Sequence, residues 1–392
     1  MTGEFVQLVE PHTESDPAAL LFQFLTEVGS LVGRGPHVLA EEDQHHANLF
    51  TVVVGRTARA RKGTSRQVVH RRLRGVDPSW DSDCQATGLS SGEGLIWAVR
   101  DAGSPADGDP SPGVSDKRLL VFESEFASPL RMMARQGNTL SPLLRNAWDT
   151  GDLRILTKNF PAKATGAHVS VIAHVTEDEL HRCLDRTDIT NGFANRFLWA
   201  CARRPQLLPD GGRLRSVNFS QFDARLRKAV AFATDLGSRA LDFDQEAHAL
   251  WRLVYPRISV ERVGAYDAAT SRAEAQVLRL SLIYGLLDCS ETIGTSHLEA
   301  ALAVWAYADE SARYIFGDDI GDPVADRILA ALRSAPEGMT REEIRDLFSH
   351  NQASEKIDRV LQKLAETGLA YCRKEPTRGR PAERWFATEA TR

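Results

Sequence analysis

The pattern of apolar and polar positions divides the chain into three regions. Over residues 16–204, short apolar runs alternate with amphipathic stretches, which is typical of an α/β unit. The runs that we expect to be strands are apolar at nearly every position: Leu49–Val54, Leu119–Glu123 and Val169–His174. Strands are uniformly apolar when helices cover both faces of a parallel sheet. The pattern therefore predicts an α/β core with a mostly parallel sheet, preceded by an N-terminal segment, residues 1–15.

The second region, residues 205–318, changes to a helical period. Apolar residues recur at i, i+3, i+4 and i+7 in four stretches, which are Phe222–Leu236, Asp244–Val260, Ala268–Leu287 and Ser296–Ile315. Thr295 or Ser296 is expected as the N-cap of the last helix, and Glu299 stands where a capping box with Ser296 would need it. We expect an all-α subdomain here.

The third region, residues 323–392, has the order helix, helix, helix, hairpin. The expected elements are the helices Val324–Leu332, Glu342–Phe348 and Ser354–Thr367 and the strands Leu369–Arg373 and Arg384–Ala387. Thr340 and Glu343 have the spacing of a capping box before the second helix. This order predicts a winged helix-turn-helix at the C-terminal end.

Composition narrows the class of protein. The chain has 392 residues, of which 42% are hydrophobic and 26% charged, with a formal net charge of −5. These values fit a globular protein and exclude a protein that is strongly basic overall. No apolar run reaches the roughly 18 residues of a membrane span, and the first residues lack the pattern of a signal peptide. Five scattered cysteines without a Cys-x-x-Cys pair favour a reducing cytoplasm. Residues Asp101–Asp116, rich in Gly, Pro, Ser and Asp, predict a mobile surface loop.

A basic turn follows the first expected strand. It begins at Gly55 and contains, in order, Arg61, Lys62, Gly63, Thr64 and Ser65 before a helical stretch. In a phosphate-binding turn, backbone N–H groups and the helix N-terminus hold the phosphates, a lysine adds charge and a hydroxyl holds Mg²⁺. The standard spacing G-x-x-x-x-G-K-[ST] would put the lysine at position 61, so a basic surface turn is the alternative.

Two acidic residues match this turn. Glu123 ends an apolar run, as in the Walker B pattern, where a strand delivers a carboxylate to the Mg²⁺ site. Glu93 lies in the Gly/Ser-rich stretch Thr87–Gly94. It is either the group that orients or deprotonates the attacking water or a solvent-exposed loop glutamate.

Two further residues complete the candidate site. His174, at the end of its expected strand, is either a γ-phosphate sensor or a hydrogen-bonded loop histidine. Arg196, in Asn191–Phe197, suits an arginine finger that acts across a subunit boundary, or it pairs with a local carboxylate. His45 and His46 have no further ligands nearby and favour a polar turn over a metal site.

Together these segments resemble those of a known family. The matching segments are His46–Phe50, Val54–Ser65, Gly88–Leu95, Glu123–Ala127, Asn138–Ser141, Leu144–Asp149, His174–Thr176 and Asn191–Phe197. Over about residues 16–316 the chain resembles the P-loop ATPases of unknown function found with primases on plasmids, phages and integrated elements. That family is related to RecA-like replicative helicases, including the RepA-like plasmid helicases.

The resemblance implies a RecA-like P-loop NTPase core that binds ATP with Mg²⁺. The implied phosphate-binding residues are Gly55, Arg61, Lys62, Gly63, Thr64 and Ser65. The implied metal ligands are Thr64 and Glu123, with Glu93 as the catalytic acid, His174 as the sensor and Arg196 as the finger. A finger in trans requires a homo-oligomer such as a ring. A primase or replication initiator is a further expected partner.

Basic residues in the third region point to DNA. The expected recognition helix carries Lys356, Arg359 and Lys363 on one face, and the expected wing carries Lys374, Arg378 and Arg380. A winged helix used for protein contacts is the alternative.

The sequence thus predicts a cytoplasmic, ATP-dependent DNA motor, a helicase-like ATPase in the replication or maintenance of a mobile genetic element. A non-hydrolysing DNA-binding initiator or regulator, with a nucleotide-sensing P-loop, is the second hypothesis. An ATPase of an anti-phage system is the third.

Overall fold

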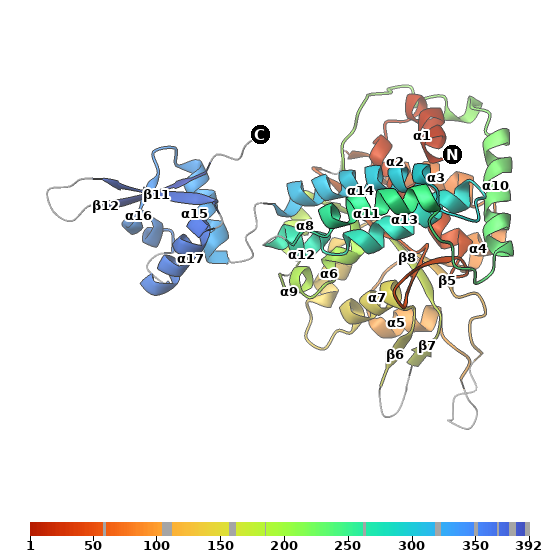
Figure 1. Cartoon of the computed structure of the whole chain (residues 1–392), viewed down its shortest axis with the longest axis horizontal. Coiled ribbons are helices and arrows are strands. Elements are labelled where there is room, and N and C mark those ends of the chain that lie inside the picture. Colours follow the sequence, from red (N-terminus) through yellow and green to blue (C-terminus); the bar gives the residue numbers. More distant parts are fainter. Residues whose placement is uncertain are drawn as a thin grey trace. The chain divides into compact units, whose positions relative to one another are not determined.

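The chain forms two compact units (Figure 1). The computed structural model describes residues 1–57, 60–103, 112–156, 162–184, 186–261, 264–317, 323–348, 352–366, 368–375 and 382–388. The first unit comprises Met1–Arg262 and Asp267–Ile315, and the second comprises Val263–Tyr266 and Phe316–Arg392. The expected α/β core and the expected helical region therefore lie together in the first unit.

A five-stranded sheet, parallel throughout, organises the first unit. Its strands are β3 (Phe50–Gly55), β4 (Gln85–Ala86), β5 (Arg118–Glu123), β8 (His168–Thr176) and β9 (Phe197–Ala202). Their order across the sheet is β4-β5-β8-β3-β9. The prediction of an α/β fold with a parallel sheet is confirmed. β8 continues two residues beyond the expected end at His174, and β4 and β9 were not predicted.

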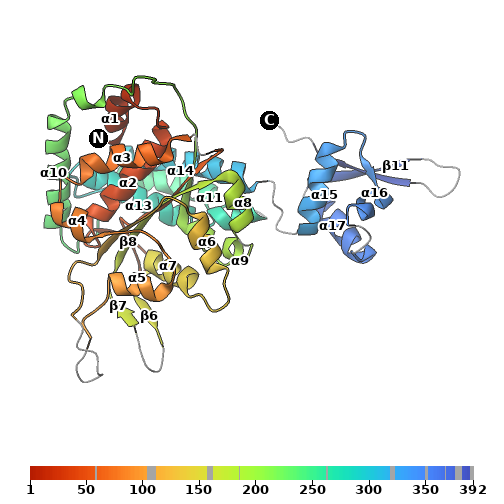
Figure 2. The same cartoon turned by 180° about the vertical axis from the view of Figure 1, so that it is seen from behind.

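Helices cover both faces of this sheet (Figures 1 and 2). α2 (Pro17–Val32) and α3 (Lys62–Leu73) lie on one face, and α5 (Gly92–Ala98), α6 (Ala127–Met133) and α7 (Leu140–Asp149) lie on the other. The strands therefore lose water on both sides, which explains their uniformly apolar sequences.

α2 is the central helix of the unit, and most of its residues are buried. It begins where the side chain of Asp16 accepts the N–H of Ala18 at 2.8 Å, and it ends at Gly33, which has a φ of 76°. The N-terminal helix α1 (Thr2–Val9) packs against it, with the ring of Phe5 stacked on Phe24 at 4.7 Å. The N-terminal segment is thus part of the core.

In the described residues of the first unit, two antiparallel hairpins lie outside the large sheet. They are β1 (His37–Ala40) with β2 (Asp43–His46), and β6 (Leu153–Ile155) with β7 (Ala162–Ala164). His45 and His46 belong to β2 and pair with β1, and His46 is buried, so the prediction of a polar turn at these histidines is wrong. Within the described residues, no group of three or more His, Cys, Asp or Glu side chains is placed to hold a metal ion.

The first unit contains further helices outside the group that covers the sheet. They are α4 (Pro78–Asp83), α8 (Glu177–Cys183), α9 (Arg186–Thr190), α10 (Ser220–Asp235), α11 (Gln245–Ile258), α12 (Ala265–Thr270), α13 (Ala273–Leu287) and α14 (Thr295–Phe316). Among them, α13 packs against α10 and α11. One expected helix is divided into α12 and α13. Because α14 already includes Thr295, neither Thr295 nor Ser296 is its N-cap; His297 accepts the N–H of Gly294 there, at 3.0 Å. Among the helices of the described ranges, none combines the length and apolarity that a bilayer crossing needs.

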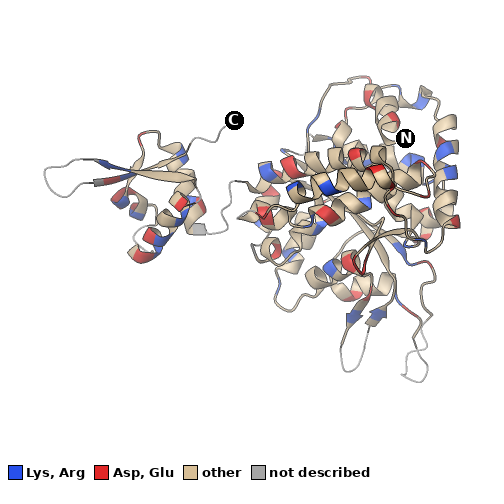
Figure 3. Cartoon of the chain, viewed as in Figure 1, with Lys and Arg blue, Asp and Glu red and all other residues tan. Residues whose placement is uncertain are grey.

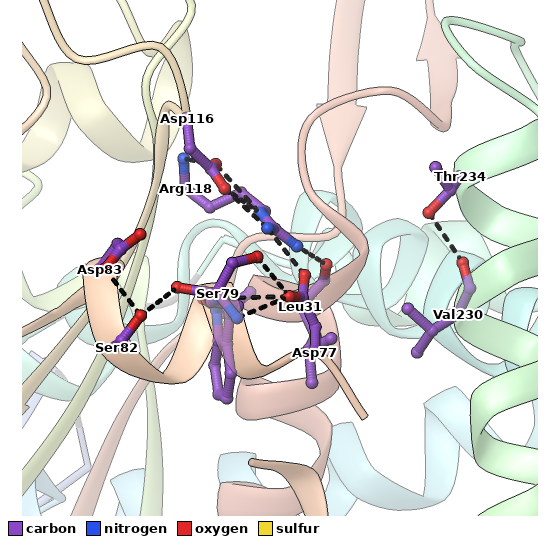
Figure 4. Close-up of polar contacts among 11 residues, drawn as sticks. Leu31, Asp77, Ser79, Ser82, Asp83, Asp116, Arg118, Val230 and Thr234 are labelled. Atoms are coloured by element: carbon purple, nitrogen blue, oxygen red, sulfur yellow. Dashed lines mark hydrogen bonds and ion pairs between the residues drawn. The ribbon is translucent and has the colours of Figure 1, made fainter. Parts of the chain in front are cut away.

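A charged cluster fixes the start of β5 (Figure 4). Arg118 donates to the carbonyl of Leu31 at 2.8 Å and forms ion pairs with Asp77 at 2.9 Å and Asp116 at 2.6 Å. Asp77 also caps α4 by accepting the N–H groups of Ser79 and Trp80. Although burial opposes it, hydrogen bonds from Ser79, Trp80 and Arg118 hold the pKa of Asp77 below its usual value. The cluster joins α2, α4 and β5 and thereby helps to set the position of Glu123 at the other end of β5.

In the second unit, the described residues from Pro323 onward form three helices and a three-stranded antiparallel sheet. The elements are α15 (Pro323–Ser334), β10 (Met339–Thr340), α16 (Arg341–Asp346), α17 (Ser354–Glu366), β11 (Ala370–Glu375) and β12 (Ala382–Ala387), and the strand order is β10-β12-β11. The capping box at Thr340 and Glu343 is confirmed, because each residue's side chain bonds the other's backbone N–H. The unit has its own apolar core, which includes Ile328, Ile344 and Leu361.

Candidate functional site

The candidate residues gather at the carboxyl edge of the parallel sheet. β8 lies between β3 and β5, with Gly55 opposite Thr176 and Glu123 opposite Ala173. The chain after β3 leads to α3 on one face, and the chain after β5 leads to α6 and α7 on the other. Connections that diverge in this way leave a crevice at the carboxyl edge, where ligands of open α/β sheets bind.

The basic turn begins α3, and its lysine folds back over the end of β3. Lys62 is the first residue of α3, and its Nζ donates to the carbonyl of Thr57 at 3.4 Å. A Cβ atom on Gly55 would lie 2.8 Å from Lys62 Nζ and 2.7 Å from the Cβ of Ala60, so only glycine fits under this turn. Burial lowers the pKa of Lys62.

Arg61 directly precedes Lys62, where the standard motif has a glycine before its lysine. Its φ is 55°, the left-handed backbone region that glycine adopts readily. The side chain pairs with Glu14 at 2.8 Å. The departure from the standard sequence therefore leaves a left-handed residue directly before the lysine and the helix N-terminus.

The next residues of the turn differ in exposure. Gly63 and Thr64 are exposed, and no atom lies within 4 Å of where a Cβ of Gly63 would be. Ser65 is fully buried, and its hydroxyl donates to the carbonyl of Lys62 at 2.6 Å. Thr64 is thus the hydroxyl of the first turn that can reach a ligand, whereas Ser65 is committed to the protein interior.

A buried hydrogen-bond chain joins Ser65 to His174. The side chain of Gln23, on α2, donates to Ser65 Oγ at 2.7 Å and accepts from His174 Nε2 at 3.1 Å. All three side chains are at most 2% exposed. Burial, with Lys62 and Arg66 nearby, lowers the pKa of His174 to about 3, so the ring is neutral at pH 7. His174 is a hydrogen-bonded residue of β8, and not a loop residue.

Sequence reasoning missed Gln23. The only signal available was a glutamine inside the apolar stretch of α2, where burial of an amide demands partners. Which partners it finds depends on the packing of α2 across β8 and α3.

Glu123 holds the loop after β4. It is 6% exposed, and its Oε1 accepts the N–H of Leu89 at 2.6 Å. Burial raises the pKa of Glu123, against the effect of the backbone hydrogen bonds from Leu89 and Gly88. The Walker B candidate therefore anchors the segment that carries Glu93.

Glu93 lies in the first turn of α5 and is exposed. Both its carboxylate oxygens are 3.4 Å from Thr139 Oγ1. At the neighbouring Gly92, a Cβ atom would lie 2.2 Å from Leu143 Cδ1 and 2.5 Å from Thr139 Oγ1, so a larger residue there would displace both side chains. The glycine holds the helix start, and the glutamate next to it faces solvent.

Arg196 directly precedes β9, so it lies at the amino edge of the sheet, opposite the carboxyl edge where Lys62 lies. It is 7% exposed and forms an ion pair with Asp149 at 2.6 Å. Asp149 also lies 3.4 Å from Arg272. A finger must present its guanidinium at the surface of the subunit. The structure instead shows the alternative, an arginine paired with a local carboxylate, and this corrects the finger assignment.

The donor types at the carboxyl edge fit a nucleotide with Mg²⁺. Lys62 supplies an ammonium group, Thr64 a hydroxyl and Glu123 a carboxylate at this edge. Mg²⁺ at nucleotide sites takes only one or two protein oxygens and completes its shell with phosphates and waters, so no larger cluster of ligands is needed.

The second unit presents cations on α17. Lys356, Arg359 and Lys363 are exposed, opposite the buried face of Ile357 and Leu361. Lys374, on β11, is also exposed. Arg378 and Arg380 lie outside the described residues.

No protein-family model matches the chain, and no curated protein matches it in sequence.

Proposed function

We propose that the chain is an ATP-dependent DNA motor with a RecA-like P-loop core and a C-terminal winged helix. The observation that supports this best is that the turn with Lys62 and Thr64 and the carboxylate of Glu123 lie at the same edge of a parallel sheet. Glu123 also bonds the loop that leads to Glu93. A mobile genetic element is the proposed setting, and the cytoplasm the proposed compartment.

Each residue has a proposed role that follows from its position. Lys62 and the N-terminus of α3 bind the phosphates, with Arg61 holding the left-handed turn before them. Thr64 and Glu123 hold Mg²⁺, which supplies positive charge at the phosphates. Glu93, exposed at the start of α5, orients or deprotonates the attacking water.

His174 takes a positioning role in this proposal. Its contact with the phosphate-binding helix runs through Gln23 to Ser65, at 3.1 and 2.7 Å. A displacement of His174 would therefore shift Ser65 in the first turn of α3. An oligomeric ring stays part of the proposal, without Arg196 as its finger, and so does a primase or replication initiator as a partner.

The exposed cations of α17 support DNA as the ligand of the second unit. Phosphate contacts from lysine and arginine side chains supply most of the affinity of a DNA-binding helix. Lys356 and Arg359 are the described residues that we expect to make such contacts.

A non-hydrolysing DNA-binding initiator or regulator is the second candidate. The contact between Lys62 Nζ and the carbonyl of its own turn, at 3.4 Å, favours it, because a lysine held there does not reach a phosphate. In that case the turn senses nucleotide or only supports the fold.

Phosphate release from ATP with Mg²⁺ tests the choice, measured with and without single-stranded and duplex DNA. We expect turnover that rises with DNA and falls by about 10²–10³ in Lys62→Ala, the usual cost of removing one group that stabilises transition-state charge. Lys228→Ala, an exposed lysine on α10, is the matched control and should keep full activity.

Glu93→Gln separates chemistry from binding. It should keep nucleotide affinity and lose about 10²–10⁴ in turnover, the contribution of a general base. An inactive wild-type protein whose duplex binding survives Lys62→Ala would instead establish the non-hydrolysing candidate.

A further inference from the structure

The β6–β7 hairpin places two cations side by side. Arg154 and Lys163 are directly opposite each other in the antiparallel register, and both are exposed. Figure 3 shows Lys and Arg on both strands of this hairpin. Like charges at opposite positions of a strand pair disfavour folding. A ligand that carries negative charge would remove this repulsion.

An exposed tryptophan lies beside the same hairpin. Trp97, on α5, is 59% exposed, and the guanidinium of Arg100 lies 3.8 Å from the centre of its ring. The next residue, Asp101, donates its N–H to the carbonyl of Lys163 at 2.9 Å, so the end of α5 adjoins β7. We call Trp97, Arg100, Arg154 and Lys163 the hairpin surface.

The nearby carboxylates are engaged with other groups as well. Asp101 accepts from Lys117 at 2.9 Å and from the hydroxyl of Thr165 at 2.7 Å, and lies 3.7 Å from Lys163 Nζ. Asp152 accepts the N–H of Gly166 at 2.9 Å. Asp101 is thus shared between two lysines, and Arg100 and Arg154 add two further positive charges to this surface.

We propose that the hairpin surface binds single-stranded nucleic acid, with Trp97 stacking on a base and Arg154 and Lys163 contacting phosphates. This inference rests on the proposed DNA ligand but does not require ATP hydrolysis. The β6–β7 hairpin leads into the amino end of β8, whereas Lys62 lies at the carboxyl edge of the sheet. The hairpin surface is therefore separate from the candidate nucleotide site.

The combination of groups selects a single strand over a duplex. Base stacking on an aromatic side chain needs an unpaired base, whereas the bases of a duplex stack on one another. A cationic groove with an aromatic platform is the usual arrangement in proteins that bind single strands without sequence preference.

Fluorescence anisotropy of a labelled oligothymidylate of about 20 nucleotides, with the full chain and no nucleotide present, tests the proposal. Trp97→Ala should weaken binding about five- to 150-fold, the range for losing one stacked base. Arg154→Gln/Lys163→Gln should also weaken it, and should reduce the slope of log affinity against log salt by about 1.4, since each single-strand phosphate contact contributes about 0.7.

The matched control is Arg227→Gln/Lys228→Gln, which removes the same charge from exposed positions of α10. Unchanged far-UV circular dichroism shows that the variants are folded. Equal losses in the control, or wild-type affinity in both hairpin variants, would overturn the proposal. A third outcome would also overturn it. If the hairpin double variant loses as much affinity for polyglutamate as for oligothymidylate, and Trp97→Ala keeps wild-type affinity for both, the surface binds acidic proteins. Lys62-dependent phosphate release is measured separately, so failure here leaves the motor proposal untouched.

Discussion

At the scale of single residues, Arg61 shows how a departure from a motif can keep its geometry. A left-handed backbone costs a non-glycine residue about 1–2 kcal/mol. Arg61 nevertheless adopts a φ of 55°, and its side chain pairs with Glu14. Such conformations persist where the surrounding structure determines them, and they cluster at functional sites.

Arg61→Gly should therefore leave the free energy of unfolding within about 1 kcal/mol, because relief of the left-handed backbone offsets the lost ion pair and the added freedom of the unfolded chain. Arg61→Val should destabilise, since a β-branched residue is disfavoured at positive φ. Urea unfolding followed by circular dichroism measures both.

Arg71→Gly is the comparison for Arg61→Gly. Arg71 is exposed within α3, where glycine costs about 1 kcal/mol. If Arg61→Gly destabilises more than Arg71→Gly does, the left-handed position is not what strains the turn.

At the scale of elements, α2 connects the candidate site. It contacts α3 and β8, and it contributes the buried amide of Gln23 between them. An amide in that position must keep its partners, because a buried polar group without a hydrogen bond costs about 1–3 kcal/mol.

Gln23→Met should lower the free energy of unfolding of the first unit by about 2–4 kcal/mol, since it leaves His174 Nε2 and the acceptor side of Ser65 Oγ without their partner. Urea unfolding measures the change. Gln67→Met, at an exposed position of α3, should change stability by less than about 0.5 kcal/mol. A Gln23→Met variant as stable as this control would show that the hydrogen-bond chain contributes nothing to the fold.

At the scale of the whole molecule, buried histidines make the first unit sensitive to acid. Burial lowers the pKa of His168 and of His174 to about 3 and that of His45 to about 4, and it lowers the pKa of His46 as well. The unfolded chain takes up protons below about pH 6.5, whereas the folded chain does so only near these lower values. Stability must therefore fall as the pH drops below about 6.5.

Between pH 7 and pH 5, each such histidine should remove about 2 kcal/mol from the free energy of unfolding. His174→Gln should make this decline shallower by about that amount, and His181→Gln, at an exposed position, should leave it unchanged. Urea titrations at pH 7, 6 and 5 give the slope of the free energy of unfolding against pH for the wild type and for each of the two variants. A decline in His174→Gln as steep as in the wild type would mean that His174 is not buried in the neutral form.

The sequence by itself determined the class of the fold. The apolar runs of β3, β5 and β8 are long enough to show that both faces of the sheet are covered, and the capping box at Thr340 identified the start of α16. Local chemistry was sufficient in these cases, because periodicity and caps involve residues within one element.

Only the tertiary structure decided which residues meet. β4 has two residues and gives no pattern of its own, Gln23 finds its partners 42 and 151 positions away, and Arg196 finds Asp149 at the opposite edge from Lys62. The order of strands and the packing of α2 set these contacts. The hydrophobic pattern within a single element predicts neither of them. For the same reason nothing in the sequence indicated that His45 and His46 lie in the strand β2, where His46 is buried and His45 half-buried.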